Sequence, residues 1–451
     1  MGLREERLSA VLARLKQVAA DGELSPVLGA EALAEARQLT GMVLDDHSDL
    51  QAMYLLGWFY WYRHQALPPG QDGSDLAIAV EMFIPCFIGG TWELPVALQP
   101  VLVGQAIHVG TAPMRDALAS ADQSLISATV DLWQRVLSAM PADHPDRAGI
   151  LSKLGIALRT RFKLTCAQAD LDAAIEAGQA AVAAVPIGHQ DRALYLSNLG
   201  NALRTRFERA GGQADLDAAI EAGQAAVAAV PVGRSDRATV LCNLGAALQA
   251  RFERTGAMVD LDAVIEAGQA AVAGAPPGHP DRSTLLSNLD AALQARFERT
   301  GAMADLDAVI EAGEAAVAAV PADHPSRMTL LSNLGAALRV RFDRTGARAD
   351  VDAAIEAGQA AVADAPEGYS GRAIFLSNLG AALHARFERT GALADLDAAI
   401  EAGQAAVASV AASDRGWTAM QSNLGGALQA RFERTGALAD LDAAKIGRAH
   451  V

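Results

Sequence analysis

Four histidines stand at the same place in successive copies of a repeated sequence, a spacing that could serve metal binding. They are His144, His189, His279 and His324, separated by 45 or 90 residues. A metal ion needs its ligands within ~2 Å of one centre, whereas stacked helix pairs lie ~10 Å apart. Arg234 and Tyr369 also interrupt the column. We therefore expect these histidines to shape loops and predict no metal site.

The sequence contains no motif of a known catalytic type. The four lysines, at positions 16, 153, 163 and 445, complete no phosphate-binding G-x-x-x-x-G-K-[ST] loop, and G-x-S-x-G, HExxH and CxxC do not occur. Cys86, Cys166 and Cys242 are far apart and have no histidine placed as a base partner. We predict that the chain is not an enzyme, that it has no catalytic residue and that it binds no cofactor.

Charged residues form two further columns. An arginine recurs at positions 161, 206, 251, 296, 341, 386 and 431, near the end of one predicted helix and just before the Asp-x-Asp that opens the next. Two interpretations stay open: an ion pair between the two helices, or a ladder that binds the carboxylates of a peptide. We expect the Asp-x-Asp to cap the second helix, with Asp215 as N-cap and Asp217 in its first turn.

The element that positions these columns is a repeat of 45 residues. An LSNLG-like segment begins at residues 151, 196, 241, 286, 331, 376 and 421. A fixed period of this size is typical of a stacked array of identical structural units. In the copy that begins at Leu196, Leu199, Leu203 and Phe207 share one face of a first helix, helix A. Gly211 ends it, and a second helix, helix B, runs to Pro231.

These residues resemble the tetratricopeptide repeat. Helix A of that family carries Asn-Leu-Gly-Asn-Ala, here residues 198–202, and helix B carries Ala-Ile-Glu, a later Ala and a closing Pro, here 219–221, Ala226 and Pro231. The period exceeds the family's 34 residues, with about two extra turns expected on helix A. Glycine replaces the bulky aromatic of helix B at positions 178, 223, 268, 313, 358 and 403. We expect a phenylalanine column on helix A to supply the missing volume, at positions 162, 207, 252, 297, 342, 387 and 432.

The resemblance implies an all-α fold: a right-handed superhelical solenoid of antiparallel helix pairs with an N-terminal helical cap. The long copies, with their RFER segment and HPDR loop, are similar to arrays that accompany CHAT (caspase-like) and nucleotide-binding signalling domains in actinobacteria. The implied function is a protein–protein interaction scaffold, the partner-sensing regulatory N-terminal part of a larger signalling protein. The alternatives are the regulatory part of a CHAT-type protease whose catalytic domain lies outside this chain, and a freestanding adaptor.

In the family, helix A lines a concave groove, and the resemblance implies that asparagines on it bind a peptide. The candidate groove residues are Asn198, Asn201, Asn243, Asn288, Asn333, Asn378 and Asn423. The alternative is that they tie neighbouring helices together. A clamp for a carboxyl terminus also needs a lysine nearby, and only Lys153 lies on such a face. The other groove-facing positions carry small residues, at 197, 242 and 287 and at 246, 291, 336 and 381.

Three segments are expected along the chain. Residues 1–140 form a diverged helical cap, 141–444 the array of six full units and one truncated unit, and 445–451 a non-native tail. Within the cap we expect helices at 3–20 and 29–45, short pieces at 92–121 broken by prolines, and a helix at 122–140. The aromatic residues of 54–62 form the core of the cap or, alternatively, a ligand cage. The tail resembles translated adapter sequence; the alternative is a real, short tail.

Bulk composition narrows the class of partner. The net charge is −16 and no basic stripe exists, which argues against nucleic acid as a partner. The first ten residues carry charges of both signs and do not resemble a signal peptide, and no apolar run is long enough to cross a membrane. Three scattered cysteines are typical of a reducing compartment. We expect a cytoplasmic protein whose partner is a protein or peptide.

Overall fold

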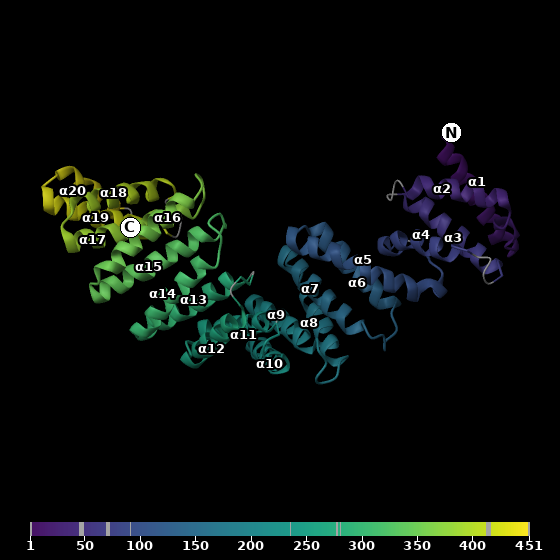
Figure 1. Cartoon of the computed structure of the whole chain (residues 1–451), viewed down its shortest axis with the longest axis horizontal. Coiled ribbons are helices and arrows are strands. Elements are labelled where there is room, and N and C mark those ends of the chain that lie inside the picture. Colours follow the sequence, from purple (N-terminus) through teal and green to yellow (C-terminus); the bar gives the residue numbers. More distant parts are fainter. Residues whose placement is uncertain are drawn as a thin grey trace. The chain divides into compact units, whose positions relative to one another are not determined.

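The computed structural model describes residues 2–44, 49–68, 73–90, 92–234, 236–276, 278–279, 281–411 and 416–449. These residues form helices and loops and contain no strand, which confirms the predicted all-α class. The chain divides into two compact units, Met1–Ala222 and Gly223–Val451, and each is treated by itself (Figure 1). Among the described helices, none is both long enough and apolar enough to span a bilayer.

The first 140 residues carry helices of uneven length. These are α1 (Leu3–Asp21), η1 (Ser25–Val27), α2 (Ala30–Leu44), α3 (Leu50–Ala66), α4 (Asp75–Gly89), η2 (Val96–Leu98), α5 (Gln99–Ser120) and α6 (Gln123–Ala139). The aromatic segment lies on α3, where Phe59 and Tyr60 are fully buried and Tyr54 stacks on Trp92 with 4.6 Å between ring centroids. These side chains therefore form the core of this region, the first of the two interpretations.

The expectation that prolines break residues 92–121 into short pieces was wrong. Helix α5 runs without interruption through both Pro100 and Pro113. Pro100 lies in the first turn, where the missing N–H has no partner in any helix. Pro113 lies in the helix interior, but it and Val109, whose carbonyl loses its bond, are both exposed, so water can replace that bond.

The last residue before α6, Asp122, caps that helix by accepting hydrogen bonds from the backbone N–H groups of Ser124 and Leu125.

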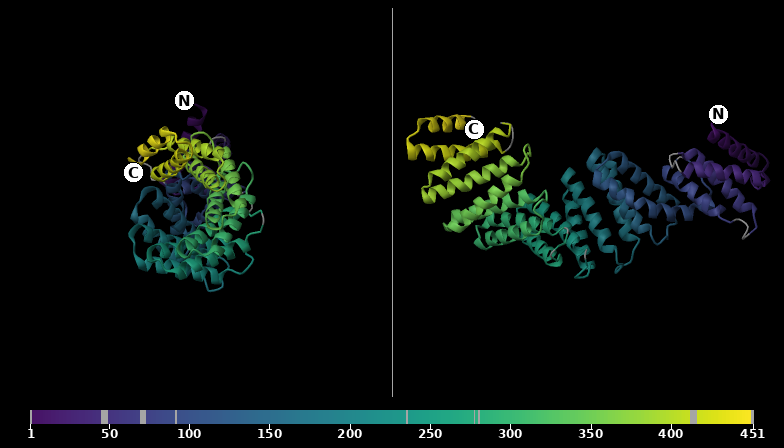
Figure 2. Two further views of the ribbon diagram at one scale, coloured as in Figure 1. Left: turned by 90° about the vertical axis from the view of Figure 1, so that its left-hand side faces the viewer. Right: turned by 45° about the horizontal axis from the view of Figure 1, so that its top comes forward.

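The regular copies each consist of one longer and one shorter helix. The helices A are α7 (Arg147–Thr165), α9 (Arg192–Ala210), α11 (Arg237–Thr255), α13 (Arg282–Thr300), α15 (Arg327–Thr345), α17 (Arg372–Thr390) and α19 (Trp417–Thr435). The helices B are α8 (Gln168–Ala183), α10 (Gln213–Ala229), α12 (Met258–Gly274), α14 (Met303–Ala318), α16 (Arg348–Asp364), α18 (Leu393–Ala408) and α20 (Leu438–Ala449). Figure 2 shows those of the second unit as successive pairs from teal to yellow.

Every helix A is 19 residues long and ends in the same way, as in α11. Gly256 takes φ +69°, and its N–H donates to the carbonyl of Phe252 at 2.7 Å. A residue without Cβ adopts this left-handed conformation at little cost, which confirms the predicted glycine stop. In the first copy Cys166 takes the glycine's place with φ 58°.

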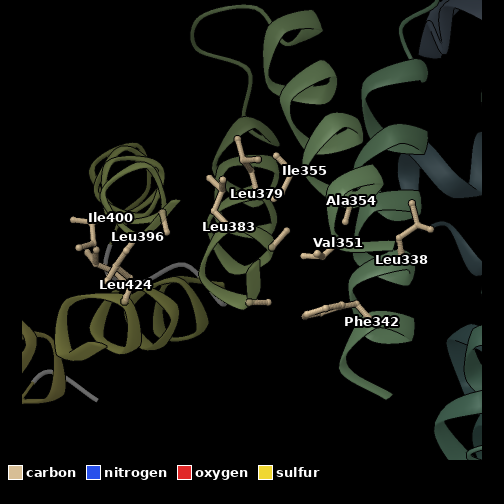
Figure 3. Packing of buried hydrophobic residues seen from close by; sticks show 14 of the residues in the cluster. Leu338, Phe342, Val351, Ala354, Ile355, Leu379, Leu383, Leu396, Ile400 and Leu424 are labelled. Atoms are coloured by element: carbon tan, nitrogen blue, oxygen red, sulfur yellow. The ribbon is translucent and has the colours of Figure 1, made fainter. Parts of the chain in front are cut away.

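The glycine column of helix B is where each copy contacts the next. A Cβ added to any of these glycines would lie 3.0 to 3.3 Å from Cδ1 of the leucine in the following Asn-Leu-Gly segment, for example Gly358 against Leu379. The expected phenylalanines contribute to the same core, and Phe162, Phe207, Phe252, Phe297 and Phe342 are buried. Figure 3 shows buried apolar side chains packed across α15 to α19, with Leu338 and Phe342 beside Ala354 and Val351.

The arginine column forms ion pairs between helices A and B. In every copy the arginine donates two hydrogen bonds to the first aspartate of the Asp-x-Asp, as Arg341 Nε and Nη2 do to Asp350 at 3.1 and 2.8 Å. The other pairs join residues 161 to 170, 206 to 215, 251 to 260, 296 to 305, 386 to 395 and 431 to 440. The ion-pair interpretation, and not a ladder for peptide carboxylates, therefore describes this column.

The expected capping role of the Asp-x-Asp was wrong. Helix B begins three residues earlier than expected, at Gln213 in that copy, so Asp215 lies inside the first turn and binds Arg206 through two hydrogen bonds. Helix B in the following copy begins at Met258 after Ala257, which provides no side-chain cap. The charge still suits the positive end of the helix dipole, but its partner is a guanidinium.

The second aspartate of five of the motifs joins consecutive copies. Arg341 Nη1 donates to Asp307 of the preceding copy at 3.0 Å, and the same bond joins Arg206 to Asp172, Arg296 to Asp262, Arg386 to Asp352 and Arg431 to Asp397. One guanidinium thus holds its own helix B and the preceding one.

A further arginine, the last residue of the HPDR loop, was not recognised from the sequence as a structural element. Arg282 Nη1 donates to the carbonyl of Val272, at the end of the preceding helix B, at 2.9 Å. Arg147, Arg192, Arg237 and Arg372 make the equivalent bond. Each arginine thus bonds carbonyls near the C-terminal end of the preceding helix, where intrahelical partners run out. The histidine of the same loop accepts a bond at Nδ1 from the backbone N–H two residues on, which places it as a loop residue.

We expect Gly358→Val to destabilise the second unit by about 1 to 3 kcal/mol, because the new side chain overpacks Leu379. Gly274→Val is the matched control, since a Cβ there meets no atom within 4 Å, and it should change the free energy of unfolding by about 0.5 kcal/mol or less. Urea unfolding followed by circular dichroism measures both. Equal effects would contradict the close approach at Gly358.

Arg341→Ala should destabilise the same unit by about 2 to 3 kcal/mol, because it leaves the buried carboxylate of Asp350 unpaired. Arg348→Ala removes an exposed arginine of the same copy, 72% accessible in its ion pair with Asp352, and should cost about 0.5 kcal/mol or less. The urea midpoints of the two variants measure the effect. A loss of stability in Arg341→Ala no greater than that in Arg348→Ala would mean that the ion pairs of this arginine column contribute little to stability.

Candidate functional site

The asparagine column lies on the helices A from α9 to α19, with Asn198 and Asn201 on α9 and one asparagine on each of the others. Asn198 Nδ2 donates to Ser152 Oγ of the preceding helix A at 3.0 Å, as do Asn378 to Ser332 and Asn423 to Ser377. Asn288 makes a longer contact of 3.9 Å with Cys242 Sγ. Asn288, Asn333 and Asn423 are exposed, and Asn198, Asn201, Asn243 and Asn378 are half-buried. The tie between neighbouring helices is therefore present for several members of the column.

This tie does not use up the asparagine side chain. A carboxamide offers two N–H donors and one carbonyl acceptor, and a bond to serine uses one donor. The exposed members keep the remaining groups available on the surface of helix A. The two interpretations of the column are thus compatible, because one atom joins the copies while the others can meet a ligand.

Two cavities of the second unit open along this column. One, of about 330 Å³, lies among α11, α12 and α13 and is lined by Cys242, Gly245, Ala246, Asn288 and Ala291 among others. The other, of about 530 Å³, lies among α13, α14 and α15 and is lined by Ser287, Ala291, Asn333 and Ala336 among others. The structure thus brings several expected groove residues together, and Ala291 lines both cavities.

A change of one residue in helix B accompanies both cavities. In the copies where helix B has Ala174, Ala354 or Ala399, the glycine of helix A packs against that alanine's carbonyl, and an added Cβ would lie 3.1 to 3.2 Å from the oxygen. Val264 and Val309 replace this alanine beside the two cavities. A Cβ at Gly245, on the helix A that precedes Val264, would meet no atom within 4 Å. Gly425 in the last copy is open as well, so valine is not the sole cause.

Asp290 distinguishes the larger cavity. It takes the place of the glycine in the LSNLG segment, which reads LSNLD in this copy alone, and it is half-buried in the cavity wall. Burial raises the pKa of its carboxyl from 3.8 to about 6. The other charged residues that line the cavity, Glu298 and Arg344, are exposed. An alignment of the copies shows this aspartate in place of glycine. It was not predicted as a site residue, because the prediction considered residues that recur in every copy.

The remaining candidates do not gather into a site. Within the part of the chain that the structure describes, no group of three histidine, cysteine or acidic residues could hold a metal ion. Lys153, the one lysine on the helix-A face, donates to Thr111 Oγ1 at 3.0 Å and lies 5.2 Å from the ring centroid of Trp133; burial lowers its pKa. Lys153 is thus held against α5 and α6.

A comparison with protein families matches residues 237–281 to the tetratricopeptide repeat. That segment is a tetratricopeptide repeat. It covers one full period, from the start of α11 to the loop before α13, and the other copies repeat its residues at constant spacing. The resemblance seen in the sequence is thereby confirmed at the level of the repeat. The association with CHAT domains stays a prediction.

Solved structures with related repeats are similar to this chain at low identity. One is the C-terminal part of a TPR repeat-containing protein from Cytophaga hutchinsonii, 12% identical, covering 68% of this chain and 97% of that one with a TM-score of 0.43. Another is a putative kinesin light chain with nearly identical TPR-like repeats from Podospora anserina, 20% identical, covering 46% and 95% with a TM-score of 0.34. No curated protein matches the sequence. These likenesses concern the fold, and no statement on function rests on them.

The raised pKa of Asp290 predicts a pH dependence of stability with a sign opposite to that of most aspartates. A carboxyl whose pKa is higher in the folded state stabilises the fold most below its unfolded pKa, and this contribution is lost as the pH rises through about 6. Relative to Asp290→Asn, the natural chain should therefore lose about 1 to 2 kcal/mol between pH 4 and pH 7, after allowance for the solvent that reaches the carboxylate.

Urea unfolding of the two proteins across this range measures the difference. Glu298→Gln removes an exposed acid of the same cavity; it is the matched control and should change the free energy of unfolding by about 0.5 kcal/mol or less. A natural chain that gains stability over Asp290→Asn as the pH rises would show that the carboxylate is paired.

Proposed function

We propose that this chain is a protein–protein interaction scaffold that holds a peptide or protein segment along the helix-A face of its second unit. The observation that carries this proposal is the pair of cavities that open beside Asn288 and Asn333 and share Ala291. Small side chains leave room there for a segment of a partner, and asparagine groups at the rim can bond its backbone. A concave cavity of several hundred Å³, lined by apolar walls and by polar groups that can fix a ligand, is typical of binding sites in general.

The finer proposal is that the array senses a partner as the regulatory part of a larger signalling protein. The support is the resemblance of its long copies to arrays that accompany CHAT and nucleotide-binding domains. The two alternatives, regulation of a CHAT-type protease and a freestanding adaptor, differ in what the gene encodes after codon 444. A single long read of genomic DNA across this position separates the adaptor from the other possibilities. The signalling protein and the CHAT-type protease both require a further domain, whereas the freestanding adaptor does not.

The compartment and the partner's charge are part of the same proposal. The three cysteines, Cys86, Cys166 and Cys242, are free thiols, as suits a reducing cytoplasm. A chain of net charge −16 repels nucleic acid and attracts basic protein surfaces. We therefore propose a cytoplasmic scaffold for a protein or peptide partner.

Ala291→Arg should abolish partner binding, because one long charged side chain then enters the rims of both cavities. Ala270→Arg is the matched control: it adds the same side chain at an exposed position of α12 that lines neither cavity. With lysate of the source organism, proteins captured by the natural chain should be retained by Ala270→Arg and reduced at least about ten-fold by Ala291→Arg. Equal capture by all three proteins would refute the proposed surface, provided that circular dichroism shows the same helix content.

A further inference from the structure

We propose that the cavity lined by Asp290 binds a basic side chain, lysine or arginine, of the segment that the scaffold holds. This inference rests on the proposed function, and it specifies the chemistry of one contact with the partner. The juxtaposition that carries it is a carboxylate without a partner, among the described residues, in the wall of a cavity that also has apolar walls.

Asp290 occupies a position at which the other copies have glycine. The equivalent position is glycine at 155, 200, 245, 335, 380 and 425. At Gly335 and Gly380 an added Cβ would lie 3.1 Å from a backbone carbonyl of helix B, so an aspartate would crowd that oxygen and repel it. The copy with Asp290 also has Val309 in place of the alanine that provides this carbonyl. The two changes occur together, and the cavity lies between them.

The carboxylate of Asp290 has no bonding partner in the part of the chain that the structure describes. The first aspartate of every Asp-x-Asp is at least half-buried and is bound by an arginine, as Asp305 is by Arg296 at 2.6 Å. Asp290 is half-buried too, yet among the described residues it has no hydrogen bond and no ion pair. A charge taken from water without a partner costs free energy, and the raised pKa of this carboxyl, caused by burial, reports that cost. A cation placed in the cavity would remove it.

The size and the walls of the cavity suit a lysine or arginine side chain. Its volume of about 530 Å³ exceeds that of one side chain, and its walls include Phe297, Leu306, Val309 and Val340. Lysine and arginine carry an apolar stem below a charged head, so the stem can lie on these walls while the head meets the carboxylate. The lining carries two acids, Asp290 and Glu298, against Arg344, and Arg344 is exposed and lies over the ring of Phe297, 5.8 Å from its centroid.

The neighbouring cavity provides an internal comparison. It has the same arrangement of three helices and the same valine, Val264, but Gly245 in place of the aspartate. The proposal therefore assigns charge selectivity to one of the two cavities and not to the groove as a whole.

The test uses the full chain and a random library of twelve-residue peptides displayed on phage. Peptides are selected on the natural chain and then measured as synthetic peptides on the natural chain and on Asp290→Asn. We expect selected peptides that fail on Ala291→Arg to share a lysine or arginine at one position. Replacing that residue by glutamine should weaken binding to the natural chain about ten-fold or more, and should have little effect on binding to Asp290→Asn. Glu311→Gln, which removes an exposed negative charge from α14 outside the cavity, should bind like the natural chain.

The outcomes of this experiment distinguish failure of the inference from failure of the proposed function. Peptides that depend on position 291 but bind Asp290→Asn as tightly as the natural chain would overturn this inference and leave the proposed function standing. The same holds for selected peptides that share an acidic or apolar residue instead of a basic one. A library that gives no peptide sensitive to Ala291→Arg would overturn both. Equal losses in Asp290→Asn and Glu311→Gln would show attraction by overall charge and would also overturn the inference.

Discussion

The guanidinium at the end of helix A is the interaction on which the arrangement of the copies depends. Arg296, Arg341, Arg386 and Arg431 each bind the first aspartate of their own helix B and the second aspartate of the preceding one. Arginine is suited to this task because its planar fork presents several donors in fixed directions. Lysine, a single charged point, would not fix the angle between two helices in the same way. The near absence of lysine from the array agrees with this requirement.

Side-chain packing holds together the helices that the ion pairs orient. The glycine of helix B lets the next helix A approach until a leucine rests on its backbone, and the phenylalanine column fills the space farther along the extended helix. Both features follow from the volumes of the side chains, and for this reason both could be predicted from the periodic sequence. Helix number, helix class and the glycine stops were predictable on the same ground, because they repeat and each copy confirms the others.

What could not be predicted depends on contacts between copies. The sequence shows that Asp215 precedes a run of helix formers, but whether it caps that helix or meets Arg206 depends on the angle between two helices. The continuity of α5 through Pro113 depends on whether the freed carbonyl faces solvent, which no local pattern contains. The cavities were also beyond prediction. Val264, Val309 and Asp290 line them and deviate from the other copies, and the effect of such deviations appears only when neighbouring helices are in place.

The two bonds of each arginine differ in their access to water, and this difference bears on the mechanics of the array. The aspartates bound within a copy are 5 to 12% accessible in Asp260, Asp305, Asp350 and Asp395, whereas those bound between copies are 52 to 62% accessible in Asp262, Asp307 and Asp397. Dissolved ions screen the exposed pair and barely reach the buried one. We therefore expect a rise in ionic strength to weaken the ion pairs between consecutive copies more than those within a copy, and so to loosen the angle between copies while each helix pair keeps its shape.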